Sequence, residues 1–236
     1  MQSTATPARA PLTGISSMAT RQLLSELTAA YAQRTGQVAA IASVGGVDAA
    51  KRVQGGEAFD VVILASDAIA KLVAAGHLRA ESVVDLVHSG VAVAVRAGTP
   101  QPDIAGEDAV RQAVLAAPTV SYSTGPSGVA LAQLFERWGI AEQIKGRIVT
   151  APPGVPVGSL VAKGEVALGF QQLSELIHVD GIAIVGPLPP AIQITTTFSA
   201  AMTTGCTRAD AAQALLDYMA SPESADAKRR QGMEPA

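Results

Sequence analysis

The stretch Phe59-Asp60-Val61-Val62-Ile63-Leu64 decides the fold class of this chain. A continuous run of valine, isoleucine and leucine is typical of a strand that is buried on both faces, as in parallel sheets. Ser66 and Asp67 follow, and their side chains can cap a helix by accepting hydrogen bonds from its free N–H groups. We expect that helix to end at Gly76, since glycine is the usual residue after a helix. The stretch therefore predicts one strand–helix unit of an α/β fold.

Two similar units precede this stretch. A short apolar strand begins at Leu12, and the helix after it is expected to end at Gly36. Residues 38–43 form a second predicted strand, and a short helix follows from Asp48. The resulting order βαβαβα is typical of a doubly wound parallel sheet.

A second α/β series follows the apolar strand 91–95 and the proline- and glycine-rich segment 98–102. Its further strands are predicted at 119–122, 147–150, 166–170 and 182–185. A return strand at 193–202 then leads to two C-terminal helices. We therefore predict an α/β protein with two doubly wound, Rossmann-like lobes and a ligand cleft between them.

The lobe boundaries follow from the change of pattern around His88-Ser89-Gly90 and from the return strand. The predicted first lobe comprises residues 1–89 plus 197–236, and the second comprises 90–196. The chain would cross between the lobes at hinges near 89–91 and 194–198. A chain of 236 residues is long enough for two lobes of roughly 100 residues each.

The composition excludes several function classes. The formal net charge is −3, and the longest basic run is Lys228-Arg229-Arg230, so we expect no nucleic-acid partner. One cysteine, Cys206, and three histidines without metal-ligand spacing predict neither a metal site nor a disulfide within the chain. The glycines form neither a dinucleotide fingerprint nor a P-loop, so no cofactor is expected.

Targeting signals are also absent from the sequence pattern. No apolar run reaches 18 residues, so no membrane span is expected. The first eleven residues, Met1 to Pro11, contain no apolar core of a secretory signal. We therefore expect a cytoplasmic protein if the chain is native from Met1, and a periplasmic one if a signal peptide has been removed.

Two turns that lead from a strand into a helix contain the candidate anion-binding groups. Leu12–Thr20 breaks from an apolar run into hydroxyl residues and then a helix, and Val120–Gly128 does the same through a glycine-rich turn. Helix N-termini present unpaired N–H groups and about half a positive charge, so both turns are candidate anion sites. A third turn, Gly169–Leu176, adds Gln171 and Gln172, whose amides both donate and accept hydrogen bonds. Ligands of open α/β sheets bind at the carboxyl ends of the strands, where all three turns lie.

Several segments together resemble a known family. They are the Ser16-Ser17 turn, Gly36, Ala58–Ser66, Gly164–Gly169 and Arg230-Gln231-Gly232-Met233. In this order they are similar to the type II periplasmic solute-binding proteins of ABC importers, and specifically to the molybdate-binding branch. The resemblance covers most of the chain. It implies two α/β lobes that close on an anion, which is gripped by hydroxyl and backbone N–H groups.

The chain departs from that branch in two places. Ser17 matches the serine of the first turn, but Val44-Gly45-Gly46 stands where the family has a second serine turn. The tyrosine expected near the return strand is replaced by Thr195–Phe198. Two donors for a tetrahedral oxyanion are thus missing, and the amides at Gln171 and Gln172 suit organic groups. We expect an organic (poly)carboxylate ligand rather than molybdate.

The first functional hypothesis is a binding protein that clamps a small anion by hinge closure. It would act as a monomer and deliver its ligand to an ABC permease. Arg21, one turn into the first helix, would add a bidentate contact to a carboxylate. The predicted ligand-binding residues are Ser17, Met18 through its N–H, Arg21, Gly45, Ser123, Ser127, Gly128, Gln171 and Gln172.

The alternative hypothesis is an enzyme. The combination of the Ser16-Ser17 turn with Gly169–Leu176 and Val185–Pro189 resembles a divergent branch of the family that is similar to aconitate isomerase. Such an isomerase would move an allylic double bond in an unsaturated tricarboxylate by removing one proton and replacing another. Proton transfer of this kind needs a base with a pKa near the working pH. The candidate bases are His88, Glu175 and Tyr122.

Overall fold

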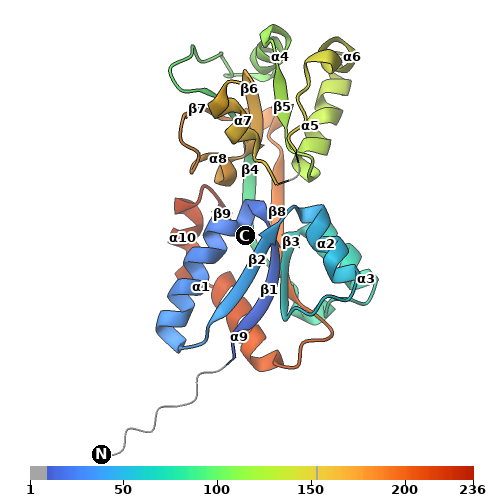
Figure 1. Cartoon of the computed structure of the whole chain (residues 1–236), viewed down its shortest axis with the longest axis vertical. Helices are drawn as coiled ribbons and strands as arrows, with labels where there is room; N and C mark the ends of the chain where they lie inside the picture. Colours follow the sequence, from blue (N-terminus) through green and yellow to red (C-terminus); the bar gives the residue numbers. More distant parts are fainter. Residues whose placement is uncertain (1–9, 153) are drawn as a thin grey trace, which may run out of the picture. The chain divides into compact units, whose positions relative to one another are not determined.

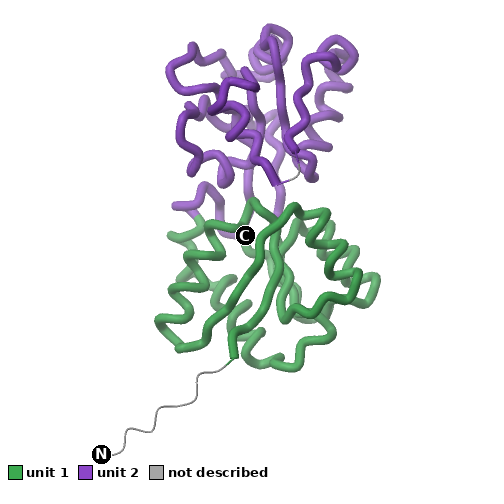
Figure 2. Tube along the Cα trace, viewed as in Figure 1, with its two compact units in different colours: residues 1–86, 198–228 green, residues 87–197, 229–236 purple. Residues whose placement is uncertain are grey.

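The computed structural model describes residues 10–152 and 154–236. The chain divides into two compact units (Figure 2). Unit 1 contains the described residues up to Leu86 together with Phe198–Lys228, and unit 2 contains Val87–Thr197 together with Arg229–Ala236. No helix in the described ranges is both long and apolar enough to cross a membrane.

Unit 1 is built on a sheet with the strand order β2-β1-β3-β8 (Figure 1). These strands are β1 (Leu12–Ser17), β2 (Ala39–Val44), β3 (Val61–Ala65) and β8 (Thr195–Met202). Strand β1 is parallel to both β2 and β3, whereas β8 is antiparallel to β3. Every residue of β3 is buried, as its continuous apolar run predicts. The doubly wound α/β character expected from the sequence is therefore confirmed for this unit.

The helices of unit 1 cover both faces of its sheet (Figure 1). They are α1 (Arg21–Thr35), α2 (Gly46–Gln54), α3 (Ser66–Ala74), α9 (Ala209–Ala220) and α10 (Ala225–Arg230). Helices α2 and α3 pack on one face, where Ile15 and Val62 meet Ala49 and Ile69 in a buried cluster. Because side chains alternate along a strand, the even-numbered residues of β1 point to the opposite face, towards α1.

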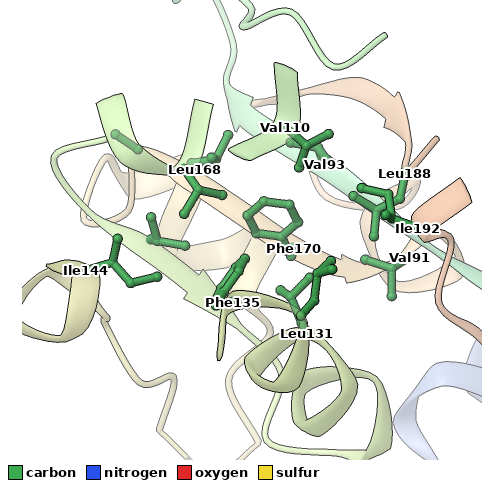
Figure 3. Close-up of a cluster of buried hydrophobic side chains, with 14 of the residues drawn as sticks. Val91, Val93, Val110, Leu131, Phe135, Ile144, Leu168, Phe170, Leu188 and Ile192 are labelled. Atoms are coloured by element: carbon green, nitrogen blue, oxygen red, sulfur yellow. The ribbon is translucent and has the colours of Figure 1, made fainter. Parts of the chain in front are cut away.

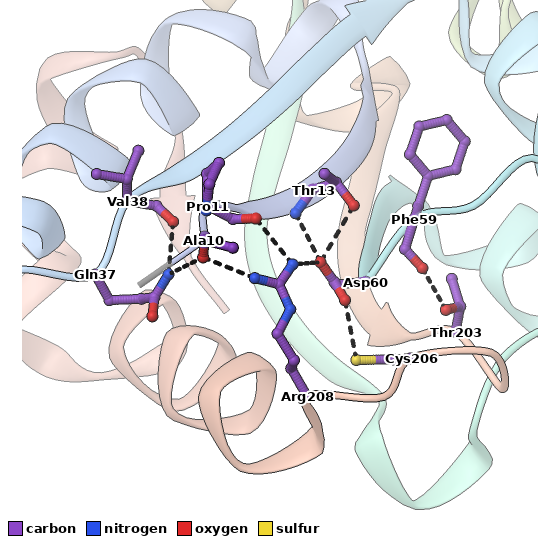
Figure 4. Close-up of polar contacts among 10 residues, drawn as sticks. All are labelled: Ala10, Pro11, Thr13, Gln37, Val38, Phe59, Asp60, Thr203, Cys206 and Arg208. Atoms are coloured by element: carbon purple, nitrogen blue, oxygen red, sulfur yellow. Dashed lines mark hydrogen bonds and ion pairs between the residues drawn. The ribbon is translucent and has the colours of Figure 1, made fainter. Parts of the chain in front are cut away.

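A buried carboxylate fastens the amino-terminal ends of β1 and β3 (Figure 4). Asp60 Oδ2 accepts hydrogen bonds from the Thr13 N–H at 2.8 Å and from Arg208 Nη2 at 2.5 Å. Its Oδ1 accepts from the buried Cys206 thiol at 3.3 Å. Burial by itself raises the pKa of the Asp60 carboxyl, but the bonds from Thr13, Cys206 and Arg208 outweigh it and hold that pKa below its ordinary value.

Replacing Asp60 with asparagine is expected to lower the free energy of unfolding by about 3 kcal/mol, the low end for a broken buried pair, because Arg208 is a third exposed. The folded-state pKa of Asp60 is depressed, so its contribution is present above the unfolded-state pKa and is lost as the pH falls through the folded-state value. Urea unfolding at several pH values measures both effects. If Asp60→Asn and the parent protein unfold at the same urea concentration at pH 7, this account of the network is wrong.

Unit 2 is built around the long strand β4 (Val84–Arg96). Its other strands are β5 (Val120–Tyr122), β6 (Leu168–Gln172), β7 (Ile182–Pro187) and β9 (Glu234–Pro235). Strand β4 pairs antiparallel with β6, β7 and β9, and β5 runs parallel to β6. Strands β4 and β8 carry the chain from one unit to the other.

The core of unit 2 lies on one face of this sheet (Figure 3). Phe135 and Phe170 meet edge to face, with ring centroids 6.1 Å apart, among valines of β4 and leucines of the covering helices. Helices α4 (Glu107–Ala116), α5 (Pro126–Arg137) and α6 (Ala141–Ile144) cover this face, and α7 (Val157–Lys163) and α8 (Leu173–Leu176) pack on the other. At Gly169 a Cβ would lie 2.6 Å from Val161, so a glycine there lets α7 pack directly on β6.

Two segments differ from the sequence prediction. The strand expected at 147–150 is wrong: Ile148 makes one isolated bridge to Val120, after a short 3-10 turn. The guanidinium of Arg147 donates to the carbonyls of Leu115 and Ala117, which ties this segment down as a loop.

Residues 229–236 were expected in the first lobe, whereas the structure places them in unit 2. A Cβ at Gly232 would lie 3.0 Å from Leu173, so the tail packs closely on α8, and Glu234 pairs with His88 of β4. The tail therefore packs on β4 and α8, and it also bonds back to Arg229 at the end of α10.

Candidate functional site

In unit 1, the carboxyl end of β1 presents an unpaired hydroxyl. Ser17 ends this strand, and a 3-10 turn over Met18–Thr20 leads into α1 at Arg21. The backbone of the turn is held by Thr20, whose Oγ1 donates to the Ser17 carbonyl at 3.1 Å. The Ser17 Oγ atom is buried and has no hydrogen-bond partner within the described residues. A buried hydroxyl without a partner costs about 1–3 kcal/mol, so this atom is poised to bind a ligand.

The N-terminus of α2 lies next to this hydroxyl. A Cβ added at Gly46 would be 3.7 Å from the Ser17 Cβ, which places the Gly45–Gly46 turn against Ser17. Residue 45 precedes the helix, so its N–H and those after it are candidates for an anion contact. Asp48, in the first turn of α2, already balances part of the positive charge at this end.

The other serine of the turn points to the opposite face of β1. Ser16 pairs in register with Ser43 of β2, and their Oγ atoms are 2.8 Å apart. Ser43 lines a groove of about 520 Å³ between β2 and α1, and Arg21 lines the same groove. The turn at Val44-Gly45-Gly46 has no side-chain hydroxyl, and Ser43 supplies one at the end of the preceding strand, on the α1 face.

In unit 2, a pair of hydroxyls stands at the start of α5. Ser123 and Ser127 have Oγ atoms 3.0 Å apart, on either side of Gly125 and Pro126. The Gly128 N–H donates to the Gly125 carbonyl at 3.0 Å, so the turn folds back on itself. This tight turn brings together three of the predicted ligand-binding residues, Ser123, Ser127 and Gly128.

The turn after β6 forms a second polar group in unit 2. Gln171 Oε1 accepts from the Gly158 N–H at 3.1 Å, and its Nε2 donates to Glu175 Oε1 at 2.9 Å. Both ends of this amide are therefore engaged inside the unit, and Gln171 acts to position Glu175. Although part of the Glu175 side chain is exposed, desolvation raises the pKa of its carboxyl to about 7, against a smaller opposing effect of the Gln171 bond.

Gln172 differs from its neighbour because one end of its amide is unpaired. Its Nε2 donates to Thr196 Oγ1 at 2.9 Å, whereas its buried Oε1 has no partner in the part of the chain that the structure describes. The Ser174 hydroxyl is also buried and has no hydrogen-bond partner among the described residues. The sequence offered no signal for Thr196 or Gly158 as partners, since they lie 24 and 13 residues from the glutamines they contact.

The two remaining candidate bases lie elsewhere in unit 2. The Tyr122 ring packs edge to face on Phe135, with centroids 5.8 Å apart. Burial, with a smaller effect of Glu136, raises the pKa of the Tyr122 phenol, which keeps it protonated at neutral pH. His88 is exposed on β4, where its Nδ1 and Thr197 Oγ1 are 2.9 Å apart. The raised pKa of the Glu175 carboxyl, about 7, suits a base that works near neutral pH.

No group of three or more histidine, cysteine, aspartate or glutamate side chains within residues 10–152 and 154–236 is placed to hold a metal ion. The polar groups described above are mostly hydroxyls, amides and backbone N–H groups, together with the carboxyls of Asp48 and Glu175, the His88 imidazole and the Arg21 guanidinium. Such a set suits hydrogen bonding to an anion.

Comparisons with known proteins identify the family of this chain. A family model described as "Bacterial extracellular solute-binding protein" matches residues 12–234. Aconitate isomerase of Pseudomonas sp. is 41% identical over 232 residues, which cover 95% of this chain and 87% of that protein. These findings confirm the resemblance on which the sequence analysis relied.

Solved structures show the same fold at low sequence identity. The periplasmic molybdate-binding protein of Azotobacter vinelandii superposes with a TM-score of 0.78 at 20% identity, over 94% of this chain and 98% of that one. The sulfate-binding protein of Mycobacterium tuberculosis H37Rv superposes with a TM-score of 0.79 at 17% identity, over 97% of this chain and 88% of that one. Both confirm the α/β architecture of periplasmic binding proteins.

Proposed function

This chain belongs to the family of bacterial extracellular solute-binding proteins, and we propose that it binds a small organic polycarboxylate. The observation that carries the proposal is the Ser17 hydroxyl, which is buried, unpaired and adjacent to the N-terminus of α2. The Ser123–Ser127 pair at the start of α5 supplies a second set of donors. Each unit thus has uncharged donors at the carboxyl ends of its strands, where ligands of open α/β sheets bind.

The donor set favours an organic acid over a metal oxyanion. A tetrahedral oxyanion that carries no hydrogen needs donors from several fixed directions, and Gly45–Gly46 offers no side-chain hydroxyl. Gln172 Oε1 is a buried acceptor that a bare oxyanion cannot satisfy, whereas the hydroxyl of a hydroxy acid such as citrate can. We also propose that the protein acts as a monomer in the periplasm and delivers its ligand to an ABC permease.

Thermal unfolding in the presence of candidate ligands tests this function. We expect cis-aconitate, trans-aconitate or citrate to raise the unfolding temperature, since a ligand at 100 times its Kd stabilises a protein by about 2.7 kcal/mol. Ser17→Ala is expected to abolish this response while leaving the unliganded protein at least as stable, because the change removes an unpaired buried hydroxyl. A shift with molybdate or sulfate alone would overturn the polycarboxylate proposal.

A second candidate function is favoured by Glu175 and by the relative named aconitate isomerase. In aconitate, a methylene group and a vinyl carbon flank the same central carbon. The Glu175 carboxylate would take a proton from the methylene, and the resulting carboxylic acid would return a proton to the former vinyl carbon. One C–H bond breaks and another forms, the double bond moves by one position, and the base is regenerated.

The donors of the proposed anion site would stabilise the negative charge that develops on a substrate carboxylate during this step. Incubating the protein with pure trans-aconitate and following the solution by NMR separates binding from turnover. Formation of cis-aconitate at a rate proportional to protein concentration supports the enzyme. Binding without any isomer over hours leaves the solute-binding role and rejects the isomerase.

A further inference from the structure

The groove between α1 and β2 has the chemistry of a binding site of its own. It has a volume of about 520 Å³ and lies wholly within unit 1. It is lined by Arg21, Leu24, Ser25, Thr28, Ala39, Ile41 and Ser43. The lining thus combines one cation and three hydroxyl groups with a short apolar surface, as expected for a small ligand that has charged ends and a carbon chain.

Arg21 occupies a position that is unfavourable for a positive charge. It is the first residue of α1, where the helix macrodipole disfavours a positive charge, and the first turn of α1 has no acidic residue. Its side chain is exposed, and no described residue forms an ion pair or hydrogen bond with its guanidinium. Arg34, in the last turn of the same helix, pairs with Glu223. An unpaired positive charge at a helix N-terminus is electrostatically unfavourable. Residues that are unfavourable for local structure are found mostly at functional sites.

The groove lies beside the end of β1 that carries the proposed anion site. Ser43, in its lining, is hydrogen-bonded to Ser16, and Ser16 directly precedes Ser17 at the end of β1. Because successive side chains of a strand point to opposite faces, the Ser16–Ser43 pair lies on the α1 face and Ser17 on the α2 face. A ligand at the carboxyl end of β1 therefore has one hydroxyl site on each face.

We propose that this groove is a subsite for a second carboxylate of the ligand. Arg21 binds a terminal carboxylate in bidentate fashion, while another carboxylate of the same molecule occupies the Ser17 site. Leu24 and Ile41 contact the carbon chain between the two. The inference rests on the proposed function and narrows it: the ligand carries at least two carboxylates on a short chain, and a monocarboxylate fills only half of the site.

Isothermal titration with trans-aconitate and with the monocarboxylate crotonate tests the subsite. Arg21→Gln is expected to weaken binding of trans-aconitate about 10- to 100-fold, the usual effect of losing a hydrogen bond to a charged group, and to leave crotonate unchanged. Arg21→Lys keeps the positive charge but lacks the paired N–H donors of a guanidinium. It is therefore expected to recover only part of the affinity for trans-aconitate. Lys51→Gln, which removes an exposed cation of α2 outside the groove, is the control and should bind like the parent protein.

Ser25→Glu provides an independent variant at an exposed position. A glutamate there lies one turn from Arg21, so it can pair with the guanidinium and repel a carboxylate from the groove. We expect the same selective loss of trans-aconitate binding. If Arg21→Gln and Ser25→Glu bind trans-aconitate like the parent, the subsite is wrong and the proposed function stands. If the parent itself binds neither carboxylate, the proposed function fails, and the subsite with it.

Discussion

Replacing Gly128 with alanine is expected to abolish anion binding and to destabilise unit 2 by about 3 kcal/mol or more. A Cβ at this position would lie 1.5 Å from the Ser123 carbonyl oxygen and 2.6 Å from its carbonyl carbon. Both are backbone atoms, so the clash cannot be relieved by a side-chain rotation. The turn must open, and opening it separates Ser123 from Ser127 and moves the start of α5.

The same turn contains its own control. At Gly125 the nearest atom to an added Cβ is the Ser123 Oγ, at 3.9 Å, and the backbone conformation is open to any residue. Gly125→Ala is therefore expected to cost less than about 1 kcal/mol, the difference between glycine and alanine before a helix. Urea unfolding and ligand-induced thermal shifts compare the two variants. Equal urea midpoints for Gly128→Ala and Gly125→Ala would show that the turn is not as tight as the structure has it.

Replacing Glu175 with glutamine is expected to lower aconitate isomerisation by a factor of about 10² to 10⁴, the usual contribution of a general base. Glutamine keeps the shape of the side chain, and its carbonyl oxygen can still accept the bond from Gln171. Binding of trans-aconitate should be retained. NMR rate measurements on Glu175→Gln, with the exposed Glu165→Gln of the same unit as the control, separate a base from a general loss of negative charge.

The pH dependence of the parent protein follows from the raised pKa of Glu175. Its ionised form is the base, so kcat/KM is expected to increase as the pH rises through about 7. The free energy of unfolding changes with pH in the opposite direction to kcat/KM. The folded-state pKa lies above the ordinary value of 4.5, so the stability associated with the protonated group is fully present below about pH 4.5 and is lost as the pH rises through about 7.

Glu175→Gln is therefore expected to be at least as stable as the parent above pH 7, while its isomerase activity is lost. This combination cannot arise from a variant that simply unfolds. Equal isomerisation rates for Glu175→Gln and the parent would remove Glu175 as the base. A parent profile that is flat between pH 6 and 8 would show that no group with a pKa near 7 controls the reaction.

Local sequence patterns were enough to predict the α/β architecture. The apolar run before Ser66 gave a fully buried strand, and the glycine at position 36 ended α1 as expected. Hydrophobic period and helix-stop residues depend on neighbours only a few positions away, so a single sequence displays them. The same holds for the Ser123–Gly128 turn, whose residues are close in the chain.

Segments whose structure depends on distant partners were harder to predict. Residues 147–150 have the composition of a strand, but the bonds from Arg147 to the carbonyls at the C-terminal end of α4, 30 and 32 residues away, hold them out of the sheet. The tail 229–236 begins in the last turn of α10, and its packing on Leu173 and its pairing with β4 place it in unit 2. Such contacts leave no periodic signal in the sequence.

For the candidate site, local sequence pattern was enough to show which turns carry donors: Ser17 and Ser123 each follow an apolar strand and precede a helix. Which polar groups at these turns are unpaired follows from the folded structure alone. Gln171 and Gln172 are adjacent and chemically identical, yet the first is satisfied at both ends by Gly158 and Glu175, while the second keeps a buried acceptor without a partner among residues 10–152 and 154–236. The reason is physical: hydrogen-bond satisfaction and desolvation depend on what surrounds an atom in space, and those neighbours come from distant parts of the chain.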